Sequence, residues 1–116
     1  MSLLTELQVF NVDIQDGLKR FVNNAALYEK MLKKFPAAAE GLPVIEHFES
    51  GNLETALANA HTLKGMTGNL SLTPLYTAYT EIVALLRENE SLKAKELLKT
   101  IFPIQQEISD CIKKYI

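Results

Sequence analysis

The sequence predicts an all-α protein: an antiparallel up-down four-helix bundle with a short additional helix at its N-terminus. Apolar residues recur at spacings of three and four along most of the 116 residues, as in amphipathic helices. The signals of β-structure are absent, because no two runs that alternate with period two flank an Asn-Gly or Asp-Gly turn. Helix start and stop residues divide the chain into segments with short connections, which favour antiparallel neighbours.

The first half of the chain predicts short helices. We expect the additional helix over residues 3–10. Asp13 is a suitable N-cap for a segment through residue 22, and Asn24 is a suitable N-cap for the helix that follows. Two prolines interrupt the apolar pattern of residues 24–50: Pro36 and Pro43. They leave open whether this region is one kinked helix or two.

The second half predicts three longer helices. We expect them over residues 53–70, 74–88 and 91–115. Their expected N-caps are Asn52, Thr73 and Ser91. Pro74 suits the first position of its helix, whereas Pro103 predicts a kink in the last one.

The helix predicted over residues 53–70 combines one apolar seam with a histidine on another face. The seam has alternating spacings of three and four: Leu53, Ala56, Ala60, Leu63, Thr67 and Leu70. At about 100° per residue, His61 lies about 130° from the mean direction of this seam. We therefore expect its side chain in solvent. An exposed imidazole is largely neutral near pH 7 and is a competent nucleophile.

The face of His61 carries few side chains that would block access to it. Gly65 and Gly68 follow it by four and seven residues, although each interior glycine costs a helix about 1 kcal/mol relative to alanine. We infer that the sequence keeps the imidazole open to a partner. Lys64 lies one turn away, where its ammonium can stabilise a dianionic group on the ring. Two leucines are expected to flank the ring and to complete a docking face: Leu57 and Leu72.

The segment around His61 resembles the signature of histidine-containing phosphotransfer (HPt) domains. The matching run is Ala60-His61-Thr62-Leu63-Lys64-Gly65, followed by Asn69 and Leu70. Ser71 stands where the family usually has glycine. Residues 17–21 and 27–35 resemble the family's entry segment and second helix, and residues 49–52 resemble the turn before its histidine helix. The resemblance covers about residues 13–90 and, loosely, the last helix.

The resemblance implies a four-helix bundle that carries phosphate in a two-component His-Asp phosphorelay. His61 would accept a phosphoryl group, at its outer nitrogen Nε2, from the aspartate of a response-regulator receiver domain and pass it to another receiver. Lys64 would stabilise the phosphohistidine, while Gly65 and Gly68 would admit the receiver's active site. The receiver would supply Mg²⁺, so the chain itself would need no metal or cofactor. A hybrid sensor histidine kinase is a further expected partner.

Composition narrows the class of protein. The length and the 47% of hydrophobic residues fit one domain over residues 1–116, alone or within a larger signalling protein. A net charge of −2 gives no basic surface for nucleic acid. No apolar run reaches the roughly 20 residues that span a membrane, so we expect no direct membrane contact. The single cysteine and the lack of a recognisable signal peptide favour a cytoplasmic protein, and a bundle that buries its own seams favours a monomer.

Several other functions stay open. We expect a phosphotransfer protein rather than an enzyme, because no ATP-binding loop and no nucleophile triad can be read from the sequence. The chain can instead be an HPt-like module that docks receivers without taking phosphate, or the histidine domain of a chemotaxis-type kinase. An enzyme with an unrecognised site in the bundle is disfavoured. A zinc site joining His47 and His61 is disfavoured too, because the chain has only two histidines and one cysteine.

Overall fold

The computed structural model of the chain describes residues 2–116, and all regular secondary structure in this range is helical. The helices are α1 (Leu3–Leu7), the 3₁₀-helix η1 (Gln8–Phe10), α2 (Ile14–Arg20), α3 (Ala25–Leu32), α4 (Phe35–Glu40), α5 (Val44–Glu49), α6 (Leu53–Asn69), α7 (Thr73–Arg87) and α8 (Ser91–Lys113). The predicted all-helical class is therefore confirmed.

Local capping signals determine where several of these helices begin. Three predicted caps accept a backbone N–H three residues on: Asp13 from Asp16 at 3.1 Å, Asn24 from Leu27 at 3.0 Å and Asn52 from Thr55 at 3.2 Å. The predicted caps Thr73 and Ser91 are wrong by one residue, because they are the first residues of α7 and α8. Pro74 is consequently the second residue of its helix, where its missing N–H still has no intrahelical partner to lose.

The region of residues 24–50 forms neither one kinked helix nor two, but the three helices α3, α4 and α5. Pro36 lies in the first turn of α4, and Pro43 directly precedes α5. Both prolines thus occupy helix starts, where the ring is tolerated. Pro103 behaves differently, because α8 continues through it.

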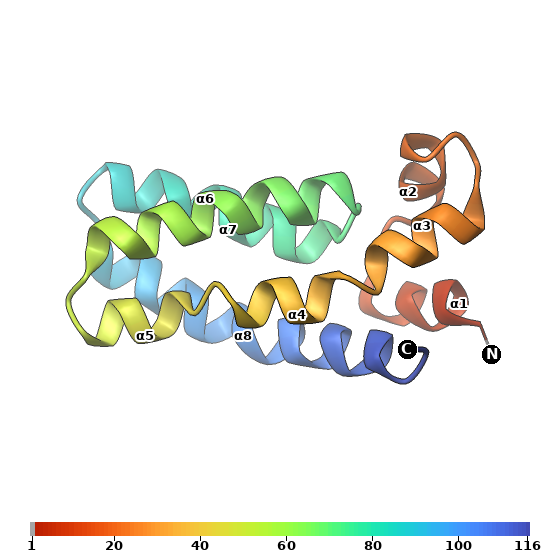
Figure 1. The fold of residues 1–116 in the computed structure, drawn as a ribbon. Coiled ribbons are helices and arrows are strands. Elements are labelled where there is room, and N and C mark those ends of the chain that lie inside the picture. The colour runs from red at the N-terminus through yellow and green to blue at the C-terminus, as the bar shows by residue number, and fades with distance from the viewer. Residues whose placement is uncertain (1) are drawn as a thin grey trace.

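The longer helices pack along one another, and the short N-terminal helices lie at one end (Figure 1). Helix α6 packs against α5 and α7, and α8 packs against α7, α4 and α5. Helix α1 contacts α8, where the Tyr115 hydroxyl and the Lys114 Nζ, the latter at 3.0 Å, bond the carboxylate of Glu6. Both ends of the chain lie near this contact (Figure 1).

The predicted seam of α6 faces the core except at its first residue. Its buried members are Ala56, Ala60, Leu63, Thr67 and Leu70. The expectation that Leu53 is part of the seam is wrong, because its side chain is 41% exposed. Leu53 begins α6 within a run of exposed residues, 49–54, and therefore lies beyond the packed part of the helix.

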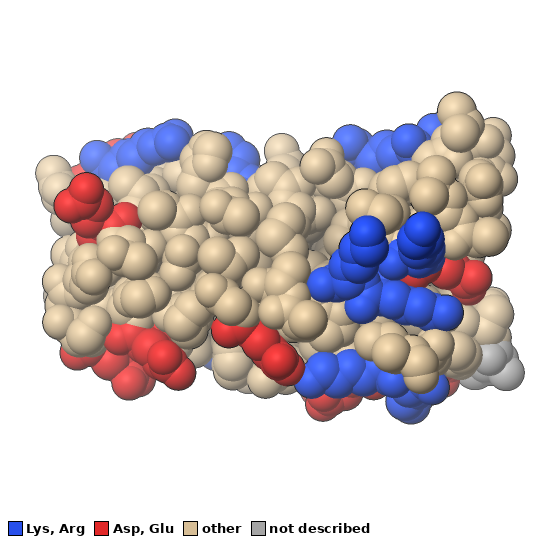
Figure 2. Space-filling view, viewed as in Figure 1, with Lys and Arg blue, Asp and Glu red and all other residues tan. Residues whose placement is uncertain are grey.

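Charged side chains are unevenly distributed over the surface. Figure 2 shows lysine and arginine side chains gathered over the α3–α4 junction and the end of α8, while carboxylates lie toward α5. Lys30 lies in the last turn of α3, and Lys33 and Lys34 follow directly, where cations interact favourably with the carbonyl end of a helix. Within residues 2–116, none of the helices has the length and apolarity needed to cross a membrane.

Candidate functional site

His61 lies on the exposed face of α6, as the helical spacing predicts. Its side chain lines an open depression of about 480 Å³, together with the half-buried Lys64 and the exposed Gly65. The depression is formed by α6, the turn after it, the start of α7 and helix α2. The structure thus brings the predicted nucleophile and the predicted cation together at one accessible site.

The two glycines after His61 differ in their surroundings. A Cβ atom built on Gly65 meets no other atom within 4 Å, so this glycine leaves open space beside the imidazole. A Cβ atom on Gly68 would instead lie 2.9 Å from two ring carbons of Tyr76. The inference that both glycines clear space for a partner is therefore wrong for Gly68. This residue lines the depression but is small because α7 places an aromatic ring against it.

The two leucines predicted to flank the ring do not line the depression. Leu57 is half-buried and packs against the core. The prediction that Leu72 belongs to an exposed docking face is wrong, because this side chain is 0% exposed. Helix α6 ends at Asn69, so the helical spacing that placed Leu72 on the face of His61 no longer applies.

The end of α6 forms a tight turn that explains the burial of Leu72. The N–H of Leu72 bonds the carbonyl of Thr67 at 2.9 Å, and the N–H of Ser71 bonds the carbonyl of Gly68 at 3.2 Å. These two bonds define a Schellman motif, in which the residue after the turn packs back on the helix. Ser71 adopts the left-handed conformation that the motif requires, with φ of 55°. A glycine would adopt this conformation without strain. The serine that stands here, in place of the glycine usual in the HPt signature, therefore carries backbone strain that a glycine would not.

A hydrogen-bond network connects this strained serine to helix α2. The Ser71 Oγ donates to Oδ2 of Asp16 at 2.6 Å, and Nε of Arg20 donates to the same oxygen at 2.8 Å. In addition, the N–H of Asp13 bonds the carbonyl of Ser71 at 3.2 Å. Asp16 and Arg20 both line the depression that contains His61. Asp13, the N-cap of α2, lines the depression as well, so this part of the chain contributes a second cation and two carboxylates to the site.

The charged residues that line the depression are two cations, Lys64 and Arg20, and two carboxylates, Asp13 and Asp16. The guanidinium of Arg20, and then the hydroxyl of Ser71, lower the pKa of Asp16 below its ordinary value. Asp16 in turn raises the pKa of Arg20. Only Nε of Arg20 bonds another described side chain, so the remaining N–H groups of the guanidinium are free to meet an anion.

Helices α2 and α3 are fixed against the end of α6 by a buried tyrosine. The Tyr28 hydroxyl donates to the carbonyl of Leu70 at 2.7 Å, and burial raises the pKa of Tyr28 to about 12. Gly17 makes this position possible, because a Cβ atom on it would lie 2.2 Å from the phenol of Tyr28. The glycine that weakens α2 as a helix is therefore needed for packing.

The sequence did not predict several residues that line the depression, among them Asp16, Arg20, Ser71 and Tyr76. The ion pair of Asp16 with Arg20 could have been predicted, because the two residues are four positions apart on one helix. Nothing local, however, connects residue 16 with residue 71, since 55 positions separate the partners of that hydrogen bond. Their juxtaposition depends on how α2 packs.

The other residues considered for metal binding lie apart from this site. His47 is half-buried in α5, and Cys111 is a buried free thiol in α8. Across residues 2–116, no three or more His, Cys, Asp and Glu side chains form a group that could hold a metal ion.

Comparisons with family models, with curated proteins and with solved structures gave no match for this chain. A functional assignment therefore depends on the chemistry of the depression and on the motif around His61.

Proposed function

We propose that this chain is a phosphocarrier of the HPt type, which accepts a phosphoryl group on His61 from a receiver-domain aspartate and passes it to another receiver. The observation that carries the proposal is the exposed imidazole on the open side of α6, in one depression with Lys64 and Arg20. The motif that continues from His61 to Leu70 supports the same function.

The proposed step is a direct transfer between two nucleophiles. The unprotonated outer nitrogen of His61 attacks the phosphorus of the aspartyl phosphate. A P–N bond forms, the P–O bond to the aspartate breaks, and the aspartate leaves as a carboxylate. The proton on the other ring nitrogen stays in place. The second receiver takes the group by the reverse reaction. Because such transition states are loose, catalysis comes mainly from positioning and charge, and the receiver would supply the Mg²⁺.

The residues around the imidazole suit the charge that develops on it. Lys64 can follow the phosphoryl oxygens, because its ammonium is a mobile point charge. The guanidinium of Arg20 offers N–H groups from the opposite element, α2, while it neutralises Asp16. Without Arg20, the carboxylate of Asp16 would repel the incoming phosphoryl group. Gly65 leaves room for the receiver to approach.

We also propose that the fold is an antiparallel four-helix bundle in which α4 and α5 together replace one long helix. The contacts of α6 with α5 and α7, and of α8 with α7, α4 and α5, support this arrangement. Three-residue connections from α5 through to α8 support it as well, since short links favour antiparallel neighbours. The proposed monomer would act in the cytoplasm, where a free thiol such as Cys111 persists.

The test is transfer from a phosphorylated receiver with Mg²⁺ to the full chain. We expect an acid-labile, alkali-stable label on the wild type and on His47→Gln, which removes the only other histidine. His61→Gln should lose the label while its circular dichroism stays unchanged. An undiminished label on His61→Gln would reject the site. Binding of the receiver without any label on the wild type would favour the docking module instead.

A further inference from the structure

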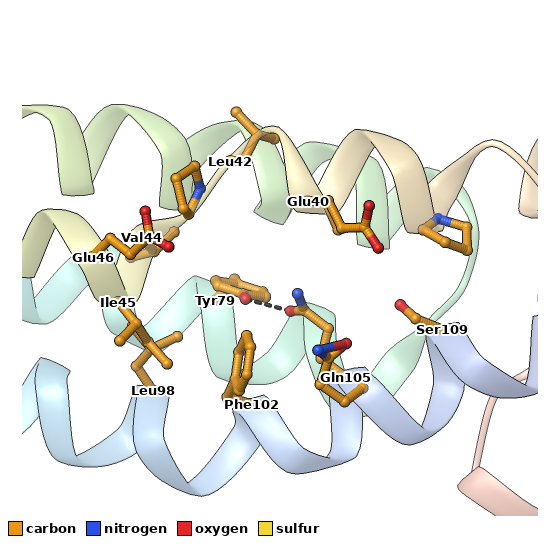
Figure 3. Close-up of a pocket in the computed structure, with 14 residues that line it drawn as sticks. Glu40, Leu42, Val44, Ile45, Glu46, Tyr79, Leu98, Phe102, Gln105 and Ser109 are labelled. Carbon is orange, nitrogen blue, oxygen red and sulfur yellow. Dashed lines mark hydrogen bonds between the residues drawn. The ribbon is translucent and has the colours of Figure 1, made fainter.

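A second cavity lies where the chain breaks between α4 and α5, facing α7 and α8 (Figure 3). It has a volume of about 280 Å³ and shares no lining residue with the depression around His61. This volume lies just below the roughly 300 to 1,000 Å³ of sites for drug-sized ligands, so it suits a smaller molecule. The cavity is therefore a separate candidate site, with no part in the proposed phosphotransfer.

Three polar side chains reach this cavity from positions that are almost wholly buried. Tyr79 is 1% exposed, Gln105 is 6% exposed and Ser109 is 4% exposed. The Tyr79 hydroxyl donates to Oε1 of Gln105, which leaves the amide nitrogen of Gln105 without a protein partner among residues 2–116. The hydroxyl of Ser109 likewise has no hydrogen-bond partner within residues 2–116. Figure 3 shows both groups directed toward the open space.

Both groups keep some contact with solvent, because no fully buried side-chain nitrogen or oxygen within residues 2–116 lacks a hydrogen-bond partner. A molecule that fills the cavity displaces this solvent and must offer the two groups a partner of its own, since burying a polar group without one is costly. An amide N–H₂ can only donate, and a hydroxyl donates most simply to the same acceptor. The cavity therefore offers convergent donors but no protein acceptor for them. A molecule that supplies one carbonyl-type oxygen would satisfy both groups at once.

The other residues that line the cavity determine the polarity and the charge of the ligand that it can bind. Apolar side chains surround the donors: Leu42, Val44, Ile45, Leu98 and Phe102. Two carboxylates lie among the lining residues, Glu40 and Glu46, and no cation does. Glu40 is paired with Lys113 at 2.7 Å, whereas Glu46 has no ion pair among residues 2–116 and keeps its negative charge unneutralised. Desolvation and this charge both disfavour an anion.

We propose that the cavity binds a compact, uncharged, mostly apolar molecule through one carbonyl-type acceptor, which accepts from the amide of Gln105 and the hydroxyl of Ser109. The apolar body of the molecule packs against Phe102 and the aliphatic side chains beside it. This binding is independent of His61, so its outcome does not depend on the proposed phosphotransfer.

The experiment is a titration of the ¹⁵N-labelled full chain with three probes of similar size and shape. Acetophenone carries the carbonyl acceptor, α-methylstyrene replaces it with a methylene group, and benzoate replaces the methyl group with a negative charge. We expect saturable shifts of the backbone amides of residues 42 and 44–46 and of the side-chain amide of Gln105 with acetophenone. α-Methylstyrene should bind at least about tenfold more weakly, because it leaves the donors unpaired. Benzoate should give no shift at these positions.

Ser109→Ala tests the hydrogen bond itself, since the substitution removes the hydroxyl and little volume. It should weaken acetophenone binding about threefold or more and leave α-methylstyrene unchanged. Ser91→Ala is the matched control, because it makes the same change in α8 at a residue that does not line the cavity. Equal affinity for acetophenone and α-methylstyrene, unchanged acetophenone binding in Ser109→Ala, or a cavity that takes up water only would each overturn the proposal.

Discussion

Glycine serves opposite purposes in two regions of the molecule. One is the exposed face of α6 beside His61, and the other is the junction where α2 and α3 meet the end of α6. Gly65 is exposed and leaves open space next to the imidazole. At the junction where α2 and α3 meet the end of α6, Gly17 lies under the buried ring of Tyr28, and within α6 itself Gly68 lies against Tyr76 of α7. Gly65 thus leaves space for a partner, whereas the space beside Gly17 and Gly68 is taken by aromatic rings of the protein. A glycine within a helix therefore indicates close approach, and the surrounding elements decide whether a partner or the protein itself occupies the space.

The largest effect should come from closing the space under Tyr28. In Gly17→Ala the new Cβ would overlap the buried phenol, displace it and leave the carbonyl of Leu70 unpaired. We expect a loss of about 2 to 4 kcal/mol in the free energy of unfolding, measured by urea denaturation. Gly65→Ala is the matched control and should gain up to about 1 kcal/mol through helix propensity. Equal effects of the two substitutions would remove the distinction between the two regions.

A substitution in the open depression around His61 should change the rate of phosphoryl uptake rather than the stability of the fold. Lys64→Gln keeps a polar side chain, one atom shorter, but removes the ammonium beside His61. On the proposed function, we expect the rate of phosphoryl uptake from a receiver to fall about tenfold, with an unchanged unfolding midpoint. Lys99→Gln, at an exposed position of α8 outside the depression, should leave the rate unchanged. A wild-type rate in Lys64→Gln would remove this lysine from the mechanism.

Ser71 is one of three residues at this junction with a positive φ, beside Val22 and Asn23, and its backbone strain can be separated from its hydrogen bond. Ser71→Ala and Ser71→Gly both remove the bond to Asp16, but only glycine adopts the left-handed conformation without strain. Ser71→Gly should therefore be more stable than Ser71→Ala by about 1 kcal/mol. Thermal or urea unfolding of the two variants measures this difference directly. Equal stabilities would mean that the turn after α6 stores no backbone strain.

The smallest effect should be a pH dependence of the stability that Asp16 contributes at the same junction. Arg20 and Ser71 lower the pKa of Asp16 from its ordinary 3.8, so its ionised form is stabilised in the folded state. This stabilisation is complete above pH 3.8 and is lost as the pH falls through the lower, folded value. The stability of the wild type should thus approach that of Asp16→Asn as the pH falls below 3.8. A difference that stays constant down to pH 2 would contradict the lowered pKa.

The parts of the molecule that the sequence predicts are those determined over a few residues. The capping side chains of Asp13, Asn24 and Asn52 act within one turn, and their helices begin where expected. The exposure of His61 follows from the burial of Ala60 and Leu63 beside it on the same helix. Each of these depends on local spacing alone.

The features that the sequence did not predict depend on contacts between distant elements or on the backbone conformation at the end of a helix. Leu72 is buried because the Schellman turn at Ser71 ends the helical spacing. The fit of Gly68 against Tyr76 depends on how α7 crosses α6, and the second cation, Arg20, reaches the depression only through the packing of α2. Spacing within one helix contains no information about either.

The proposed function requires that the imidazole of His61 carries the phosphoryl group. The most direct measurement is ³¹P NMR of the full chain after incubation with a phosphorylated receiver and Mg²⁺, joined with the ¹⁵N spectrum of the same sample. We predict a phosphoramidate resonance that is absent from His61→Gln, together with shifts at Lys64 and Gly65 and none at His47. A phosphoramidate signal that persists in His61→Gln, or a wild-type chain that binds the receiver and never acquires one, would contradict the claim.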